Sequence, residues 1–222
     1  MLGSEELELR RQITRVCRRL YERGLIAGQD GNVSARMSNG LLLVTPSAVS
    51  KVDLVEGDLV VVNTDGRAVA GVGRPSSELG MHLRIYARRP DIRAVVHAHP
   101  PTATAFAVAG EDLMEPVLPE LIVQTGGVPL VPYATPGSDA LADAFEPFLP
   151  HHDAFLMANH GATTLGPNLS IAHQRMESLE HAARIVCTAR LLGKVTPLTA
   201  EQTAELWTLR NVGSGGPASG RE

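Results

Sequence analysis

The sequence predicts a single α/β domain, an α/β sandwich whose sheet is largely antiparallel. Two hairpin signals, Asn39-Gly40 and Asp65-Gly66, follow one another, and short apolar stretches flank each of them. Segments with helical periodicity are interleaved with these hairpins, without the regular strand-helix alternation or the G-x-G-x-x-G turn of a doubly wound parallel sheet. With 222 residues, 44% of them hydrophobic, the chain can bury a sizeable core as one domain.

The first expected elements are a helix and two hairpins. Residues 4–23 repeat apolar side chains at helical spacing, with Ser4 as the N-cap and Gly24 as the stop signal. Two hairpins follow, with strands expected within residues 35–47 and over residues 58–63 and 67–71.

A second helix is expected over residues 74–90, where Ser76 or Ser77 can cap its start and Pro90 ends it. Gly or Pro bounds the remaining expected elements: strands at 92–100, 127–133 and 154–160, and helices near 102–110, at 138–149 and at about 169–192. The predicted domain covers residues 1–210. The tail, residues 211–222, is rich in Gly, Ser and Pro and is expected to be disordered.

Composition excludes several classes of function. The net charge is −4 and the isoelectric point is about 6.1. The sequence has no dense basic stretch that would indicate a surface for binding nucleic acid or lipid. No apolar run approaches membrane-spanning length, and the charged N-terminal residues do not resemble a signal peptide. With only Cys17 and Cys187, the sequence predicts a reduced, cytoplasmic protein that needs no disulfide.

Three histidines and one glutamate are the candidate metal ligands. His97 and His99 end an apolar strand at a spacing of two, so both side chains point to one face of the sheet. His160 ends another apolar strand before Gly161, and Glu78 lies near the start of the second helix. Three imidazoles and a carboxylate suit a divalent ion such as zinc. A structural histidine pair, and a carboxylate that faces the helix dipole, are the alternatives.

Six motifs, in order, carry a resemblance to a known family: "DGNVS", "TPSAVSK", "GRPSSELGMHLRIY", "AVVHAHP", "VPYATPG" and "ANHGATTLG". From about residue 8 to residue 193 the chain resembles the class II aldolase/adducin family, most closely the branch of fuculose-1-phosphate aldolase. The resemblance implies a three-layer α/β/α subunit. It also implies a homotetramer with one divalent metal per subunit, usually zinc, in clefts between neighbouring subunits.

The family's functional residues fall on matching positions of this chain. The resemblance implies metal ligands at His97, His99, His160 and Glu78, with Glu78 also the catalytic carboxylate, and a phosphate pocket at Asn32, Ser47, Ser76 and Ser77. Hydroxyl, amide and backbone N–H groups at a helix N-terminus can bind an anion without a lysine, although the serines can equally act as caps. Manganese, iron and cobalt suit the same ligands as zinc.

The implied activity is that of a metal-dependent aldolase, an aldehyde-lyase that splits a ketose 1-phosphate into dihydroxyacetone phosphate and an aldehyde. Glu78 would act as the base. Two departures bear on the substrate: Ala48 replaces the glycine and Glu120 the tyrosine that fuculose aldolases usually carry.

Glu120 is therefore a second catalytic candidate, with an ordinary surface carboxylate as its alternative. A glutamate at this place resembles methylthioribulose-1-phosphate dehydratase, and sugar-acid phosphate decarboxylases also vary here. Dehydration, decarboxylation and epimerisation are alternative reactions, with Glu120 favouring dehydration and Glu78 favouring aldol cleavage. An adducin-like, non-catalytic interaction module is a remote alternative.

Overall fold

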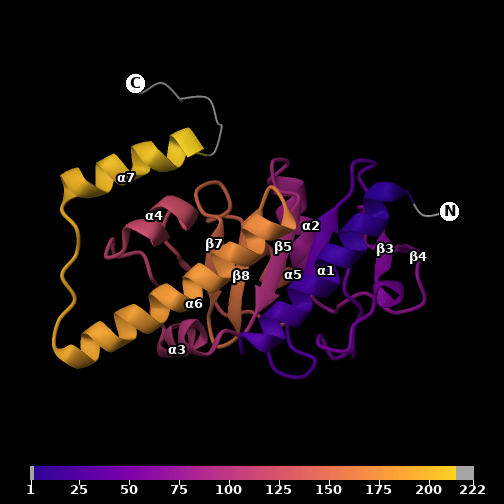
Figure 1. Cartoon of the computed structure of the whole chain (residues 1–222), viewed down its shortest axis with the longest axis horizontal. Coiled ribbons are helices and arrows are strands. Elements are labelled where there is room, and N and C mark those ends of the chain that lie inside the picture. Colours follow the sequence, from indigo (N-terminus) through magenta and orange to yellow (C-terminus); the bar gives the residue numbers. More distant parts are fainter. Residues whose placement is uncertain (1–2, 214–222) are drawn as a thin grey trace.

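A computed structural model of the protein describes residues 3–213 and places helices on both faces of one central sheet (Figure 1). The helices are α1 (Ser4–Glu22), α2 (Leu79–Arg88), α3 (Pro101–Ala109), α4 (Pro119–Thr125), α5 (Asp139–Ala144), α6 (Leu169–Leu192) and α7 (Ala200–Gly213), with a 3₁₀ turn, η1 (Glu56–Asp58). The strands are β1 (Asn32–Arg36), β2 (Leu42–Val44), β3 (Val60–Val62), β4 (Ala68–Ala70), β5 (Ala94–Ala98), β6 (Leu130–Val131), β7 (Ala154–Met157) and β8 (Gly161–Gly166).

The eight strands form one sheet in the order β4-β3-β2-β1-β5-β8-β7-β6. Within residues 3–213, every neighbouring pair in this sheet is antiparallel except β6 and β7. The prediction of a largely antiparallel sheet is confirmed. Both predicted hairpins are present as well, with Gly40 and Gly66 at positive φ in their turns.

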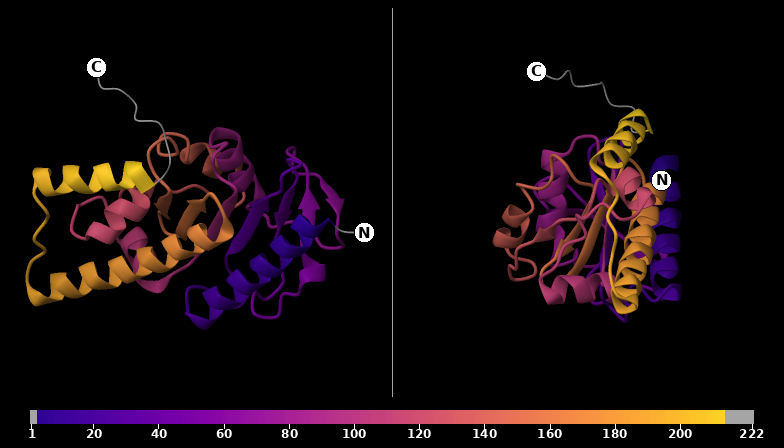
Figure 2. Two further views of the ribbon diagram at one scale, coloured as in Figure 1. Left: turned by 45° about the horizontal axis from the view of Figure 1, so that its top comes forward. Right: turned by 90° about the vertical axis from the view of Figure 1, so that its left-hand side faces the viewer.

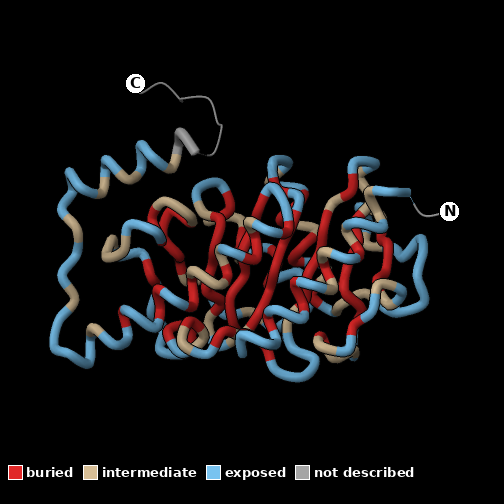
Figure 3. Tube along the Cα trace, viewed as in Figure 1, coloured by how far each residue is buried: buried red, intermediate tan, exposed pale blue. Residues whose placement is uncertain are grey.

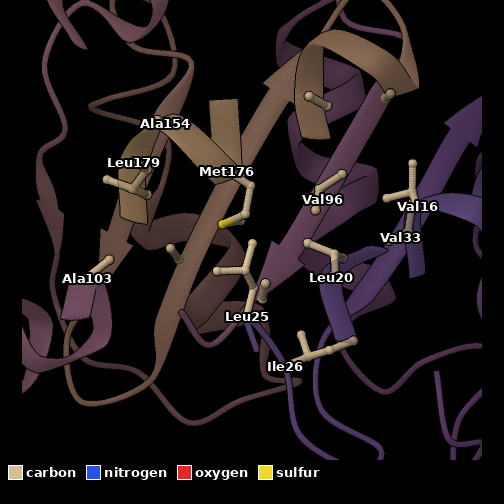
Figure 4. Packing of buried hydrophobic residues seen from close by; sticks show 14 of the residues in the cluster. Val16, Leu20, Leu25, Ile26, Val33, Val96, Ala103, Ala154, Met176 and Leu179 are labelled. Atoms are coloured by element: carbon tan, nitrogen blue, oxygen red, sulfur yellow. The ribbon is translucent and has the colours of Figure 1, made fainter. Parts of the chain in front are cut away.

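Alternate residues of the strands supply two separate cores, which gives the three-layer arrangement (Figure 2). Val33 and Val96 pack in the larger core against α1, α3 and α6, as Figure 4 shows for one region. Their neighbour Val95 packs in the other core, with Ile85 of α2 and Phe145 next to α5. The side chains of Ser34 and His97 therefore point to the α2 layer, because Ser34 is paired with Val95 and His97 lies two residues after it, so all three lie on the same face of the sheet.

Several boundaries differ from the prediction. Gly3, not Ser4, is the N-cap of α1, and α2 begins only at Leu79 because Ser76 binds the N–H groups of Glu78 and Leu79. Strand β8 was not expected, because the sequence suggested that the chain turns away from the sheet at Gly161. Instead β7 and β8 form a hairpin.

Helix α7 was not expected either. It packs against α4 at the periphery of the fold, where much of its surface is exposed (Figures 1 and 3). Buried Asp153 anchors it through Arg210 at 2.6 Å and also pairs with Arg89 at 2.8 Å and Arg175 at 3.0 Å. Since α7 reaches Gly213, the predicted tail beyond that residue lies outside the described part of the chain.

No helix within residues 3–213 combines the length and the apolar character that crossing a membrane requires. Cys17 is buried, Cys187 is exposed, and both are free thiols.

Candidate metal centre

The first two candidate ligands come from the middle of the sheet. His97 is fully buried in β5, and its Nδ1 lies 2.9 Å from the backbone oxygen of Ala162 in β8. Because a carbonyl only accepts hydrogen bonds, Nδ1 carries a proton, and Nε2 is the atom of His97 that can offer a lone pair to a metal. His99 follows β5 directly, and the Nε2 atoms of the two rings lie 3.1 Å apart. The two side chains converge, as their spacing predicts.

His160 reaches the same place from the β7–β8 turn. The turn is tight: Asn159 has a φ of 56°, and a Cβ on Gly161 would lie 2.6 Å from the backbone oxygen of Ala98. Only glycine allows this close approach between the turn and the end of β5. As a result, the His160 ring centroid lies 4.8 Å from that of His97 and 5.0 Å from that of His99.

Glu78 completes the group from the N-cap position of α2. Its Oε2 lies 3.2 Å from Nε2 of His97 and accepts a hydrogen bond of 2.8 Å from Nδ2 of Asn32. Its Oε1 lies 3.3 Å from Nε2 of His160 and has no hydrogen-bond partner among the described residues, although it is buried.

The electrostatics favour an ionised Glu78 carboxylate beside neutral His99 and His160 rings. Burial opposes ionisation of Glu78, but His97, His160 and the Asn32 amide together hold the pKa of its carboxyl group well below the usual range. Burial and the neighbouring His97 and His160 lower the pKa of His99 to about 4. Burial and His97 lower the pKa of His160 as well. At neutral pH the site therefore offers imidazole lone pairs and a negative charge.

This donor set fits a divalent metal. Two nitrogens bound to one zinc ion at tetrahedral angles lie about 3.3 Å apart, close to the separation of the His97 and His99 Nε2 atoms. Metal-ligand atoms of His97, His99 and His160 all lie within 4.8 Å of one another. An ion among them would also give Oε1 of Glu78 the partner that it lacks in the described residues.

A cleft of about 250 Å³ opens above these residues, and Glu78, His99 and His160 line its floor. The four candidate phosphate residues, Asn32, Ser47, Ser76 and Ser77, all line the same cleft. Sequence reasoning missed a further wall residue, Lys51, whose Nζ donates to the backbone oxygens of Gln29 and Val49 at 2.9 and 3.0 Å. The only sequence signal for Lys51 was its place at the end of the "TPSAVSK" motif.

Comparison with known proteins assigns the chain to a family. The model for the Class II Aldolase and Adducin N-terminal domain matches residues 11–187. The chain belongs to the class II aldolase family. Members of this family are metal-dependent, in agreement with the histidine cluster.

Curated relatives of this family member carry out more than one reaction. A 3-oxo-tetronate 4-phosphate decarboxylase of Pectobacterium atrosepticum is 34% identical over 209 residues, which cover 91% of this chain and 94% of the relative. A 5-deoxy-D-ribulose 1-phosphate aldolase of Bacillus thuringiensis is also 34% identical, over 89% of this chain and 92% of the relative. These names support an enzyme of the class II aldolase family.

Solved structures agree with this assignment. YgbL from Escherichia coli, titled a putative aldolase/epimerase/decarboxylase, superposes with a TM-score of 0.84 at 35% identity, over 90% of this chain and 98% of its own. An L-fuculose 1-phosphate aldolase gives a TM-score of 0.85 at 32% identity, over 93% and 96% of the two chains.

Two residues in which this chain departs from the pattern of fuculose aldolases lie in different places. Ala48 lines the cleft with a φ of 58°, a left-handed conformation that costs an alanine roughly 1 kcal/mol. Glu120 lies at the start of α4, in a separate groove between α4 and α6 that Ser178 and His181 also line. Within one chain, the structure thus brings Glu78 and the three histidines together but places Glu120 elsewhere.

Proposed function

We propose that this protein is a metal-dependent lyase that breaks a carbon–carbon bond of a small phosphorylated sugar or sugar acid and yields dihydroxyacetone phosphate. One observation carries the proposal. The three imidazoles and the ionised Glu78 carboxylate converge on the floor of a cleft whose wall presents hydroxyl groups and Lys51.

Two reactions named among the relatives share one chemical outcome. In the cleavage of a ketose 1-phosphate, the C3–C4 bond breaks, the C4 hydroxyl loses its proton, an aldehyde leaves and the bonding electrons remain on C3. In the decarboxylation of a 3-oxo-tetronate 4-phosphate, the C1–C2 bond breaks, carbon dioxide leaves and the electrons remain on C2. Both leave the enediolate of dihydroxyacetone phosphate, and one proton added to carbon completes the product.

His97, His99 and His160, with Glu78, are the residues that would hold the ion, for which we propose zinc because neutral imidazoles and a carboxylate suit it. When bound, a divalent ion supplies Lewis-acid stabilisation of the negative charge on the substrate's carbonyl oxygen. Glu78 transfers the proton. Its low pKa keeps it ionised and Asn32 holds Oε2, so Oε1, when it is not bound to the ion, would accept a proton and pass it to carbon.

In this proposal the phosphate group binds to the serine residues of the cleft. Ser47, Ser76 and Ser77 line the cleft, and the N-terminus of α2 directs its positive dipole end towards it. Lys51 lines the same cleft, with its Nζ bound to the backbone oxygens of Gln29 and Val49. These groups would orient the substrate so that its carbonyl carbon lies beside Glu78.

Of the two substrates, we put the 3-oxo acid first and the ketose 1-phosphate predicted from the sequence second. Decarboxylation requires one proton on C2. Glu78 would take this proton from a solvent water molecule, whose hydroxide leaves with the carbon dioxide as bicarbonate, and would pass it to carbon. Cleavage to an aldehyde also requires a group that removes a hydroxyl proton at the far end of the substrate. The relatives include both reactions at the same identity: the decarboxylases are 34% identical over 207 and 209 residues and the 5-deoxy-D-ribulose 1-phosphate aldolase over 199, so the order rests on the proton transfers.

We further propose that the protein is a homotetramer with active sites between subunits. Glu120 lies outside the cleft of its own chain, so it can act on a substrate only from a neighbouring subunit.

The test begins with the metal content of the purified protein and of a His97→Ala, His99→Ala double variant. Both are then incubated with 3-oxo-tetronate 4-phosphate, L-fuculose 1-phosphate and 5-deoxyribulose 1-phosphate, and dihydroxyacetone phosphate is measured by enzymatic reduction with NADH. Formation of this product with carbon dioxide, or with an aldehyde, decides between the two reactions. Bound metal without this product from any substrate contradicts the proposal. A product lighter by one water molecule would indicate a dehydratase.

A further inference from the structure

A buried row of polar side chains runs from Glu78 along the interface between α2 and β1. On α2, His82 and Tyr86 follow Glu78 at intervals of four residues, so all three side chains lie on one face of the helix. On β1, Asn32 and Ser34 point to the same side of the sheet, two residues apart. Four helical residues span about 6 Å and two strand residues about 6.7 Å, so the two sets can interleave.

The side chains do interleave, and each contact is a hydrogen bond. Asn32 lies between Glu78 and His82: its Nδ2 donates to Glu78, and its Oδ1 lies 2.5 Å from Nε2 of His82. Ser34 lies between His82 and Tyr86, with its Oγ 2.7 Å from Nδ1 of His82 and 2.8 Å from the phenol oxygen of Tyr86. His82 is 2% exposed and Ser34 1%, so water does not compete for these bonds.

The carboxylate sets the direction of every bond in this row. An ionised Glu78 only accepts, so Asn32 must present its amino group to Glu78 and its carbonyl oxygen to His82. His82 must then carry its proton on Nε2, and Nδ1 must accept from Ser34, whose oxygen accepts in turn from Tyr86. Burial, with His97 nearby, lowers the pKa of His82 to about 3, in agreement with the neutral ring that this pattern needs.

We propose that His82 is a positioning residue for the metal centre: its Nε2–H holds the Asn32 amide in the one orientation that donates to Glu78. Oε2 of Glu78 is thereby fixed and Oε1 is left facing the histidines. Without the His82 donor, the Asn32 amide can turn its oxygen towards the carboxylate and repel it. The effect on turnover rests on the proposed function, whereas the effect on metal affinity does not.

Three substitutions separate this role from simple packing. His82→Gln places an amide nitrogen near the position of Nε2 and can still donate to Asn32. His82→Asn is shorter, reaches Ser34 but not Asn32, and retains a polar side chain. Ile85→Val lies one turn along α2 in the apolar core and controls for a general loss of stability. For each variant, the Co²⁺ dissociation constant is measured by visible absorption, and kcat and KM are measured on the substrate that the wild type accepts.

We expect His82→Asn to weaken Co²⁺ binding and lower kcat by about 10-fold, the lower end of the effect of losing a group bonded directly to a metal ligand, because His82 acts through Asn32, with KM little changed. His82→Gln should restore most of both losses, and Ile85→Val should resemble the wild type. In wild type, ¹⁵N NMR should place the His82 proton on Nε2.

Three results would overturn the proposal: His82→Asn equal to wild type, His82→Gln no better than His82→Asn, or Ile85→Val as impaired as His82→Asn. If the wild type binds Co²⁺ but turns over none of the substrates, the proposed function fails. The order of Co²⁺ affinities then still decides the role of His82.

Discussion

Replacing Glu78 with glutamine tests the central residue of the proposed chemistry. The substitution keeps the size of the side chain and an oxygen that can accept from Asn32, so the bond at 2.8 Å is retained. The other atom changes from an oxygen to an amino group, 3.3 Å from Nε2 of His160. Glu78→Gln thus removes the proton-accepting atom while the three imidazoles keep their places.

The expected magnitudes follow from these two changes. Loss of a general acid–base group lowers kcat by about 10²- to 10⁴-fold, which corresponds to about 3–5 kcal/mol in the activation barrier. Metal affinity should fall less, by about 10- to 100-fold, because one ligand is altered and its amino group competes for the His160 lone pair. At saturating metal the variant should therefore be fully loaded and almost inactive.

The assay combines elemental analysis with the release of dihydroxyacetone phosphate at several metal concentrations. Glu177→Gln is the matched control, because Glu177 lies on α6 outside the cleft, 3.5 Å from His173, and should leave both readings unchanged. A kcat within about threefold of wild type at full metal loading would refute the proton-transfer role of Glu78. If metal and turnover are lost together and excess metal restores both, Glu78 is a ligand only.

Three further predictions concern the assembly, the peripheral helix and pH. On a ketose 1-phosphate, whose cleavage requires a second proton-transfer group, Glu120→Gln should lower kcat without loss of metal, and its co-expression with Glu78→Gln should restore about a quarter of the activity if each site combines two subunits; no restoration would contradict the interfacial site. Asp153→Asn removes the buried carboxylate that half-buried Arg89, Arg175 and Arg210 share and should cost about 2–3 kcal/mol, or about 4–12 °C in the thermal midpoint, whereas Asp91→Asn, at an exposed pair, should cost about 1 kcal/mol or less. In the folded protein the pKa of His82 is about 3, whereas in the unfolded chain it is about 6.5. Below pH 6.5 the unfolded state therefore binds a proton that the folded state does not, and the metal-free protein should lose about 2 kcal/mol of stability through His82 between pH 7 and pH 5. Urea titrations that show no such loss would contradict the burial of His82 as a neutral ring.

Local sequence signals predicted the elements whose ends are marked by capping or turn residues such as Gly, Pro, Ser and Asn. Helix α6 was predicted at its observed bounds, because a long apolar periodicity ends at Gly193. Strand β8 was missed because "GATTLG" is short and contains small residues, and its place in the sheet depends on pairing with β5 and β7. Helix α7 was missed because its stability comes from contacts with α4 and from Asp153, which no local pattern reveals.

The candidate site was predictable to the extent that it depends on strand periodicity and strand ends. That rule placed His97, His99 and His160 in one cluster, while metal binding itself stays a prediction. The position of Lys51 depends on backbone oxygens from two loops, which spacing does not encode. The proposed role of Glu120 depends on a neighbouring subunit, which neither the sequence nor the structure of one chain describes.

The placement of β5 in the interior of the sheet, between β1 and β8, affects how the metal centre can be handled. Amide hydrogens of an inner strand exchange with solvent only through the largest opening events of a protein, whereas the helices at the periphery open more easily. His97 is carried by this slowest-exchanging part of the chain. A chelator should therefore remove the ion without unfolding the strand that carries the His97 imidazole. One preparation can then be reloaded in turn with zinc, cobalt or manganese under native conditions.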